Sequence, residues 1–298
     1  MPTKTTIETL PLTDWNGPYE PALKARAVAG LESGAVLFFP GLAFRLEESE
    51  KQFLDARVSD GKAKNISLDP DTGKIQATSL QGEEADRLAA MMARFAHQAS
   101  SLVHDLLPYR QVERARTSYR PVEVKGRGYS KISDDRLLHI DAFPSRPMRA
   151  GRRILRFFAN VAPASPRHWL VGEPFEPFAR SFLPRVGPHL SIKSWPGKSW
   201  LYEKLGVTRG RRSPYDEMML SLHDAAKLDG DFQKTSPRDA VDFPAQSCWL
   251  VFTDQVLHAA LGGEFALEQT FHLDVAEMAD PARAPIRVLE RLSGRVLA

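Results

Sequence analysis

The stretch SCWLVFTDQVLHAAL, residues 247–261, contains two short runs of apolar, β-branched and aromatic residues. Runs of this length and composition are typical of buried strands. Comparable segments recur throughout the chain after residue 110, with Pro and Gly between them; they are ARTSYRPVEV (115–124), RRILRFFANVAP (152–163), DAVDF (239–243) and ALEQTFHLDV (266–275). The pattern predicts a core made mainly of short strands.

Helical patterns come before and between these strands. Apolar residues spaced three and four apart predict amphipathic helices over 22–32 and 84–107, with a buried strand, AVLFFPG, at 35–41. The polar, turn-rich region 59–77 predicts an exposed hairpin or loop, and a helical insert is expected over about 173–230. Helices followed by many strands favour an α+β fold, with helices packed on an antiparallel β-sandwich or jelly roll.

The chain shows no repeat, no low-complexity tract and no linker, so we expect one domain over 1–298. A helical part with an early strand should occupy about 1–108, the β core about 109–276 and a C-terminal tail 277–298. The chain lacks a GxGxxG or GxxxxGK[ST] turn, which argues against a nucleotide-binding α/β fold.

Bulk composition limits where the protein works. No apolar run approaches the ~20 residues that cross a bilayer, and MPTKTTIETL at the N-terminus lacks the apolar stretch of a signal peptide. Cys248 is the only cysteine, so an intrachain disulfide is impossible, which fits a reducing compartment. We therefore expect a soluble cytoplasmic protein with Cys248 in its core.

Basic residues concentrate in the middle of the chain. Residues 110–212 contain 22 Lys or Arg and 8 Asp or Glu, whereas the rest contains 18 and 29. Such an excess is compatible with ordinary solvated surface. Because the same segment carries the strongest chemical motif, we infer an anionic ligand. Charge alone leaves nucleic acid, phosphorylated lipid and carboxylated sugar open.

That motif is LLHIDAF (137–143), in which one residue separates His139 from Asp141. Alternate side chains of an extended segment point the same way, so both residues can face one metal. His258, at the end of a buried apolar run, supplies the third ligand. Two imidazoles and a carboxylate form the facial triad of non-haem iron(II) oxygenases, with positions open for a keto acid and dioxygen. The alternative is that His139 and Asp141 merely share a surface hydrogen bond.

Other histidines fit a ligand role less well. His223 and Asp224 lie on a predicted helix, where adjacent side chains diverge. His272 lies in the last predicted strand, and we expect it near the site but outside the ligand set.

A keto-acid cosubstrate needs a cation for its far carboxylate, ideally the forked guanidinium of Arg. Many oxygenases of this type place that cation shortly after the distal His, but residues 268–272 (EQTFH) contain none. The segment RRILRFF (152–158) offers Arg156 first and Arg153 second, since a buried Arg is costly to leave unpaired. Gln269 is a further cofactor-binding candidate. Alternatively, Arg156 pairs with an internal Asp or Glu.

Five segments together resemble the bacterial Kdo hydroxylases, iron(II)/2-oxoglutarate dioxygenases that act on 3-deoxy-D-manno-oct-2-ulosonic acid (Kdo): TSYRPVE (117–123), HIDAFPSRP (139–147), RRILRFFANVAP (152–163), DQVLHAAL (254–261) and FALEQTFHL (265–273). The resemblance implies a double-stranded β-helix (jelly-roll, cupin-like) core, with His139, Asp141 and His258 on the iron ligand positions. It also implies iron(II), 2-oxoglutarate and O2 as cofactors. The implied reaction hydroxylates C3 of Kdo in the lipopolysaccharide inner core to give Ko, with succinate and CO2 released.

The resemblance gives the basic segment a purpose, because Kdo is a carboxylate and its lipid A carries phosphates. The candidates for substrate contact are Arg120, Arg127, Arg146 and Arg149. We expect Kdo-bearing lipid A as the partner, no nucleic acid, and work at the cytoplasmic face of the inner membrane. Residues 173–185 either contact that bilayer or form a packed surface helix. The sequence does not indicate an oligomeric state.

Two other functions fit the same residues. One is the same oxygenase chemistry on another substrate, such as an alkylated nucleic acid or a fatty acyl thioester. The other is a catalytically silent jelly-roll module that binds anionic glycolipid, for which the missing late-strand cation is the main support. Iron-dependent conversion of 2-oxoglutarate to succinate separates the enzyme from the binding module.

Overall fold

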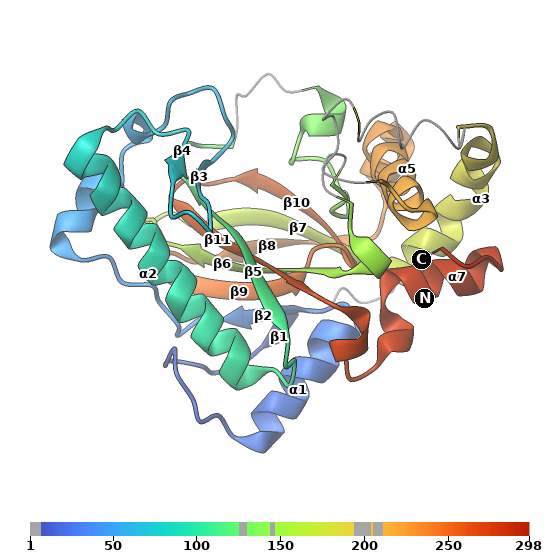
Figure 1. Cartoon of the computed structure of the whole chain (residues 1–298), viewed down its shortest axis with the longest axis horizontal. Coiled ribbons are helices and arrows are strands. Elements are labelled where there is room, and N and C mark those ends of the chain that lie inside the picture. Colours follow the sequence, from blue (N-terminus) through green and yellow to red (C-terminus); the bar gives the residue numbers. More distant parts are fainter. Residues whose placement is uncertain (1–6, 125–129, 144–146, 194–203, 205–210, 298) are drawn as a thin grey trace.

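The computed structural model describes residues 7–124, 130–143, 147–193, 204 and 211–297, with only the backbone described for 187–193. Two β-sheets form its centre, and helices cover them (Figure 1). The larger sheet has the strand order β1-β2-β9-β6-β11-β5-β3-β4, and the smaller has the order β10-β7-β8. Neighbouring strands are antiparallel except for the parallel pair β1 and β2.

The strands of the larger sheet, in chain order, are β1 (Ile7–Thr9), β2 (Val36–Phe39), β3 (Ile66–Leu68), β4 (Ile75–Gln76), β5 (Val112–Arg120), β6 (Arg153–Asn160), β9 (Ser247–Phe252) and β11 (Ala266–Leu273). Those of the smaller sheet are β7 (Arg167–Pro174), β8 (Arg238–Phe243) and β10 (Val256–Gly262). Each sheet therefore joins strands that are distant in sequence.

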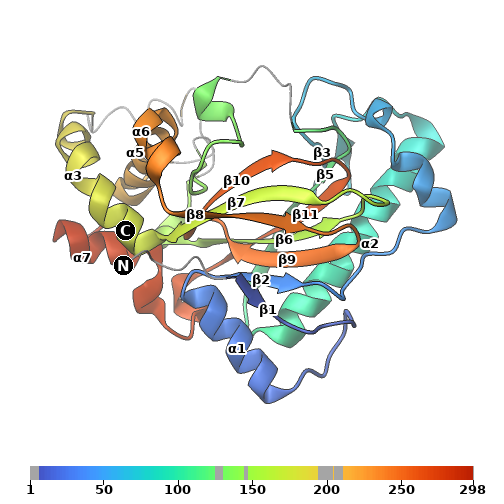
Figure 2. The same cartoon turned by 180° about the vertical axis from the view of Figure 1, so that it is seen from behind.

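Helices lie on one face and at one end of the sheets (Figure 2). The outer face of the larger sheet packs against α1 (Pro21–Glu32) and α2 (Gly82–Leu106). The segment between β7 and β8 forms α3 (Phe175–Lys193), α5 (Pro214–Leu228) and α6 (Gly230–Thr235), and α7 (Pro285–Ser293) packs against α3. Along the described part of the chain, no helix combines the length and apolar character that crossing a membrane requires.

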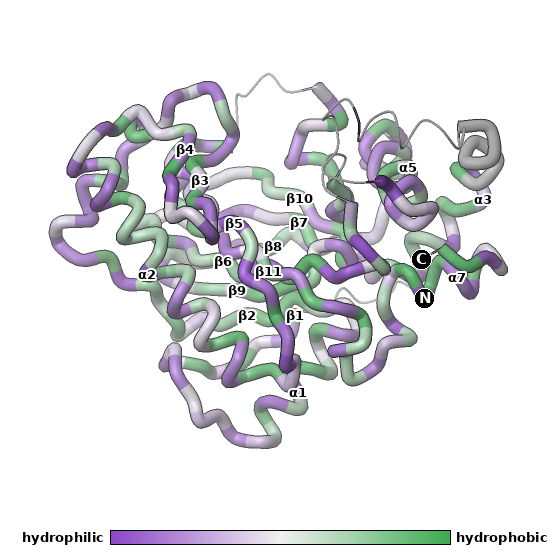
Figure 3. Tube along the Cα trace, in the orientation of Figure 1, coloured by the Kyte–Doolittle hydropathy of each residue, from purple (hydrophilic) through white to green (hydrophobic). Residues whose placement is uncertain are grey.

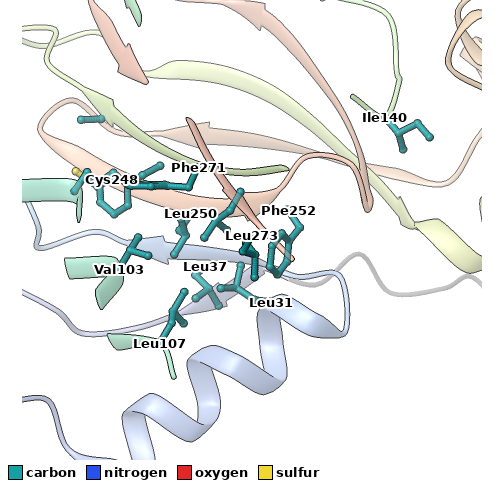
Figure 4. Packing of buried hydrophobic residues seen from close by; sticks show 14 of the residues in the cluster. Leu31, Leu37, Val103, Leu107, Ile140, Cys248, Leu250, Phe252, Phe271 and Leu273 are labelled. Carbon is teal, nitrogen blue, oxygen red and sulfur yellow. The ribbon is translucent and has the colours of Figure 1, made fainter. Parts of the chain in front are cut away.

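Strand alternation divides the core into two layers. In β9, Cys248, Leu250 and Phe252 face the helices, while Trp249 and Val251 face the smaller sheet. Figure 4 shows the first layer, in which Leu31 of α1 lies close to this face of the sheet. Hydrophobic residues gather along the central strands and hydrophilic ones along the outer loops (Figure 3). The single cysteine is fully buried, as expected, and burial raises the pKa of its thiol.

The fold agrees with the main expectations from sequence. The two N-terminal helices, the early strand and the helical insert are present. The polar region 59–77 contains the hairpin β3–β4. The chain is a mixed α/β protein with a large, mainly antiparallel sheet. This architecture is compatible with a jelly roll.

A buried ion pair connects β6 to the turn after β9. Arg153 is fully buried, and its guanidinium donates to both carboxylate oxygens of Asp254 at 2.8 and 3.1 Å. It also donates to Gln255 Oε1 at 2.6 Å and lies 3.9 Å from the ring centroid of Phe252. The charges are thus paired where water cannot reach them. Removing one partner would leave the other as an unpaired buried charge, which typically lowers stability by about 3–5 kcal/mol.

We therefore expect Asp254→Ala to lower the free energy of unfolding by about 3–5 kcal/mol in a urea titration. Asp242, 65% exposed and paired with His168, provides the control. Asp242→Ala should cost less than about 1 kcal/mol, because exposed pairs contribute little. Equal losses in the two variants would contradict the role assigned to the buried pair.

Candidate metal centre

His139 and Asp141 lie on an extended segment that runs beside the smaller sheet. The His139 backbone N–H donates to the His258 carbonyl at 3.1 Å, and the His258 N–H donates back to the His139 carbonyl at 2.9 Å. The Asp141 N–H donates to the Thr253 carbonyl at 2.8 Å. Ile140, between the two ligand candidates, is fully buried in the core. Backbone pairing thus brings residues separated by more than a hundred positions side by side.

The three candidate ligands converge on one point. One potential ligand atom from each of His139, Asp141 and His258 lies within 4.8 Å of the other two. Among the described residues, these are the three His, Cys, Asp or Glu side chains whose spacing could hold a metal ion. The predicted triad is therefore assembled by the fold.

Both imidazoles have a fixed orientation. His139 Nδ1 lies 2.7 Å from the Leu137 carbonyl, and His258 Nδ1 lies 2.9 Å from the Val256 carbonyl. A carbonyl only accepts, so each Nδ1 carries a proton and each Nε2 keeps a lone pair for a metal. Burial lowers the pKa of both histidines, which keeps them neutral. They are therefore in the form that binds a metal.

Asp141 supplies the negative charge of the group. Its side chain is 12% exposed, and Oδ1 lies 3.8 Å from His139 Nε2. Burial alone would raise the pKa of Asp141, but the positive charge of Arg156 opposes it, and the pKa is held below its usual range. Oδ2 lies 3.0 Å from Arg156 Nη2, yet no described residue donates a well-oriented hydrogen bond to it. An ionised, buried oxygen beside two free imidazole nitrogens fits a divalent metal such as iron.

A cavity of about 340 Å³ opens beside the triad. Its aromatic lining consists of Phe143, Phe158 and Trp169. Its charged and imidazole lining consists of Lys64, Arg120, Asp135, His139, Asp141, Arg156, Arg167, His223, Lys227, His258 and Glu268. The space is thus large enough for small organic acids, and its lining is rich in cations.

Strand register gives the cavity a direction. Arg156 pairs with Thr270 of β11, and Arg120 pairs with Ala266 of the same strand. Four residues of strand separate these levels, or about 13 Å. The end of the cavity at Arg156 holds the candidate metal ligands, and Arg120 lies towards the opposite end. Arg167, at the start of β7, lies near the Arg120 end: its guanidinium donates to the Gly263 carbonyl, and the Gly263 N–H donates to Glu123, three residues after Arg120.

The structure separates the predicted cofactor residues. Arg156 lines the cavity and has two ion pairs, to Asp141 at 3.0 Å and to Glu268 at 2.9 Å. Pairing with internal carboxylates was the alternative left open by the sequence. Arg153 does not reach the cavity, because strand alternation turns it towards Asp254, and the choice of Arg153 does not fit this geometry.

Gln269 is also wrongly placed for a cofactor ligand. Its side chain is fully buried, donates to the Ala115 carbonyl at 3.0 Å and accepts from the Thr117 hydroxyl at 2.6 Å. It holds β11 against β5 on the face opposite the cavity. Glu268, the preceding residue, faces the cavity instead.

The predicted substrate arginines divide in the same way. Arg120 lines the cavity and pairs with Asp135 at 3.4 Å. Arg149 is exposed and is not part of the lining. Arg127 and Arg146 lie outside the described residues, so their candidate roles stay predictions.

Several cavity residues were missed from sequence, notably Arg167 and Lys227. Arg167 shares the alternation of Trp169 along β7, which was recognisable only once β7 was paired with β10. Lys227 follows His223 by four residues on α5, and this spacing places the two on one helix face. His223 is not a member of the ligand group, as expected, but its ring centroid lies 5.5 Å from that of His139. His272 is also outside the group, and burial lowers its pKa to about 4.

The chain matches known proteins along nearly its whole length. A family model described as 3-deoxy-D-manno-oct-2-ulosonic acid (Kdo) hydroxylase matches residues 14–296. Two similar solved structures are of the Kdo hydroxylase KdoO, a non-haem Fe(II) α-ketoglutarate (2-oxoglutarate)-dependent dioxygenase. One, in complex with α-ketoglutarate and Fe(III), has a TM-score of 0.92 and 42% identity, covering 98% of this chain and 97% of that one. The other, with cobalt(II), has a TM-score of 0.92, 43% identity and the same coverage. No curated protein sequence matches significantly.

We expect His139→Ala, Asp141→Ala and His258→Ala each to weaken Fe(II) binding by more than the roughly 10- to 100-fold that loss of a supporting partner costs. Calorimetric titration with Fe(II) under anaerobic conditions measures this directly. His272→Ala, which leaves the triad intact, serves as the control for metal content. Normal metal affinity in His258→Ala, together with a loss in His223→Ala or His272→Ala, would show that the third ligand is wrongly assigned.

Proposed function

Because the chain belongs to the Kdo hydroxylase family, whose member KdoO is an iron(II)/2-oxoglutarate-dependent dioxygenase, we propose that it hydroxylates C3 of a Kdo unit in the lipopolysaccharide inner core. The products are the corresponding Ko unit, succinate and CO2. The observation that carries the proposal is the convergent His139–Asp141–His258 group beside a cation-lined cavity. We also propose that the two sheets form the double-stranded β-helix of a single dioxygenase domain.

The protein's share of this chemistry is to hold and orient. The metal, when bound with 2-oxoglutarate, supplies the redox chemistry that activates dioxygen. Three protein ligands leave coordination positions open for the keto acid and dioxygen. Arg156 keeps the Asp141 carboxylate ionised and in place through their 3.0 Å contact. Phe158 and Trp169 wall the cavity and limit the access of water, which protects a reactive centre.

We propose Arg167 as the residue that binds the far carboxylate of 2-oxoglutarate. Arg167 is 4% exposed, and its Nη1 donates to the Gly263 carbonyl at 2.5 Å. Among the described residues, no carboxylate lies within 4.0 Å of its guanidinium. Burial and the neighbouring Arg120 lower its pKa to about 9. A buried cation without a counter-ion is costly, and a ligand carboxylate removes that cost.

Arg156, the choice made from sequence, remains the competing prediction. Two carboxylates already neutralise Arg156, whereas Arg167 has only a carbonyl partner. The position of Arg167 towards the Arg120 end of the cavity, away from the triad, also suits a dicarboxylate whose other end binds the metal. We therefore expect Arg167 to control the affinity for 2-oxoglutarate and Arg156 to control the affinity for the metal.

The substrate proposal places Kdo-bearing lipid A at the cavity mouth, with Arg120 as one contact. The basic segment 110–212 would attract such an anion and the anionic membrane that carries it. Work at the cytoplasmic face of the inner membrane is part of this proposal. Nucleic acid is not expected to bind.

The function is tested by supplying Fe(II)-loaded protein with 2-oxoglutarate, oxygen and Kdo-bearing lipid A. We expect succinate, and by mass spectrometry a glycolipid that has gained one oxygen atom on Kdo. Asp141→Ala should form neither product. Succinate without oxidised glycolipid would indicate another substrate, and the absence of both products from the native protein would favour the silent binding module.

The two arginines are separated by 2-oxoglutarate titrations of the cobalt(II)-loaded protein. Arg167→Gln should weaken 2-oxoglutarate binding roughly 10- to 150-fold, because hydrogen bonds between charged groups contribute about 1.5–3 kcal/mol. Arg156→Gln should instead weaken metal binding, roughly 10- to 100-fold, because Asp141 loses its partner. The reverse pattern would return the cosubstrate role to Arg156.

A further inference from the structure

One face of α5 borders the cavity close to the metal ligands. His223 and Lys227 lie four residues apart on this helix, and both line the cavity. The His223 ring meets the His139 ring nearly at a right angle, with centroids 5.5 Å apart. Because α5 belongs to the insert between β7 and β8, these residues come from outside the two sheets. The insert therefore adds polar groups to a site that the sheets build.

Lys227 is a buried cation with little to neutralise it. It is 3% exposed, and its Nζ donates to the Ile132 carbonyl at 2.9 Å. No carboxylate of the described residues comes within 4.0 Å of this ammonium group. Burial lowers its pKa, an effect that the more distant Asp135 opposes. Among the described residues, the other two donor positions of the ammonium group have no hydrogen-bond acceptor.

Two of the cations that line the cavity differ from the others in having no carboxylate partner. Among the described lining residues, Lys64 and Arg120 pair with Asp135, and Arg156 pairs with Asp141 and Glu268. Lys227 and Arg167 have carbonyl partners instead. The proposed reaction brings two organic acids into this space, 2-oxoglutarate and the sugar acid. The cavity thus has one uncompensated cation for each.

The position of Lys227 relative to the metal strand is fixed. Gln233 of α6 accepts from the Leu138 N–H at 2.9 Å and donates to the Leu138 carbonyl at 2.9 Å, immediately before His139. The same side chain donates to the Ala226 carbonyl of α5 at 2.8 Å. One glutamine therefore connects the end of α5 to the strand that carries the ligands. Such support is what a precise binding group requires.

We propose that Lys227, with His223 one helical turn before it, binds the carboxylate of the sugar acid beside the metal, so that the helical insert orients the substrate. This inference rests on the proposed function. In Kdo the carboxylate is C1, and a single carbon separates it from C3, the carbon to be hydroxylated. A cation that holds C1 must therefore lie close to the metal. Lys227 lines the same cavity as the three candidate ligands, and His223, one turn before it, has its ring centroid 5.5 Å from that of His139.

The test compares two ligands on protein loaded with cobalt(II) and 2-oxoglutarate, where binding is measured without turnover. The ligands are Kdo-bearing lipid A and the same glycolipid with the Kdo carboxylate reduced to an alcohol. The native protein should bind the acid roughly 10- to 100-fold more tightly. In Lys227→Met this preference should fall below about three-fold, whereas Lys227→Arg should keep part of it. Lys234→Met, the same substitution at an exposed site of the insert, should keep all of it.

Thermal unfolding separates binding from a structural role. A buried ammonium group without a counter-ion destabilises the fold, so Lys227→Met should have an equal or higher Tm. A lower Tm with the acid preference intact would overturn the proposal, and so would an intact preference at an unchanged Tm. Because binding is measured without turnover, these results are independent of whether iron-loaded protein hydroxylates Kdo. A lack of hydroxylation by the native protein would contradict the proposed function instead.

Discussion

The reciprocal backbone hydrogen bonds between His139 and His258 are the constraint on which the site depends. They join an extended segment to β10 at the level where both imidazoles face the same side. A slip of one residue would turn His139 and Asp141 into the core and Ile140 towards the metal, because side chains alternate along a strand. The nearby carbonyls then fix each ring by its Nδ1 proton. The assembly of this candidate metal site thus depends on strand register as well as on the side chains themselves.

The cations that line the cavity beside these strands differ in how far carboxylates neutralise them. Carboxylates compensate Arg156 beside the triad and Lys64 and Arg120 along one wall, and these pairs hold Asp141 and Asp135 ionised despite their burial. Two cations, one towards each end of the cavity, have only carbonyls as partners. Uncompensated buried charge lowers stability, so its presence at two places in a single cavity is best explained by ligands. These two buried cations thus lower the stability of the fold but provide binding positions for anionic groups.

Much of this arrangement was accessible from sequence. The triad was predicted from His139 and Asp141 on either side of Ile140 and from the apolar run before His258. This was possible because alternate side chains of an extended segment point the same way. Arg156 could be placed in the cavity for the same reason. The roles of Arg153 and Gln269 were misjudged, since the face a strand residue occupies depends on where the sheet packs. Arg167 and Lys227 escaped notice because they become site residues only through pairing between β7 and β10 and through the docking of α5.

The position of Cys248 has a consequence for the lifetime of a protein that handles dioxygen. Among side chains, exposed thiolates are especially susceptible to oxidation. Cys248 lies on the helix side of β9, whereas its neighbour Trp249 packs on the side that Trp169 and the cavity share. Burial and the raised pKa keep the sulfur protonated. The β-sheet therefore works as a shield, and oxidative damage should first reach the aromatic wall of the cavity.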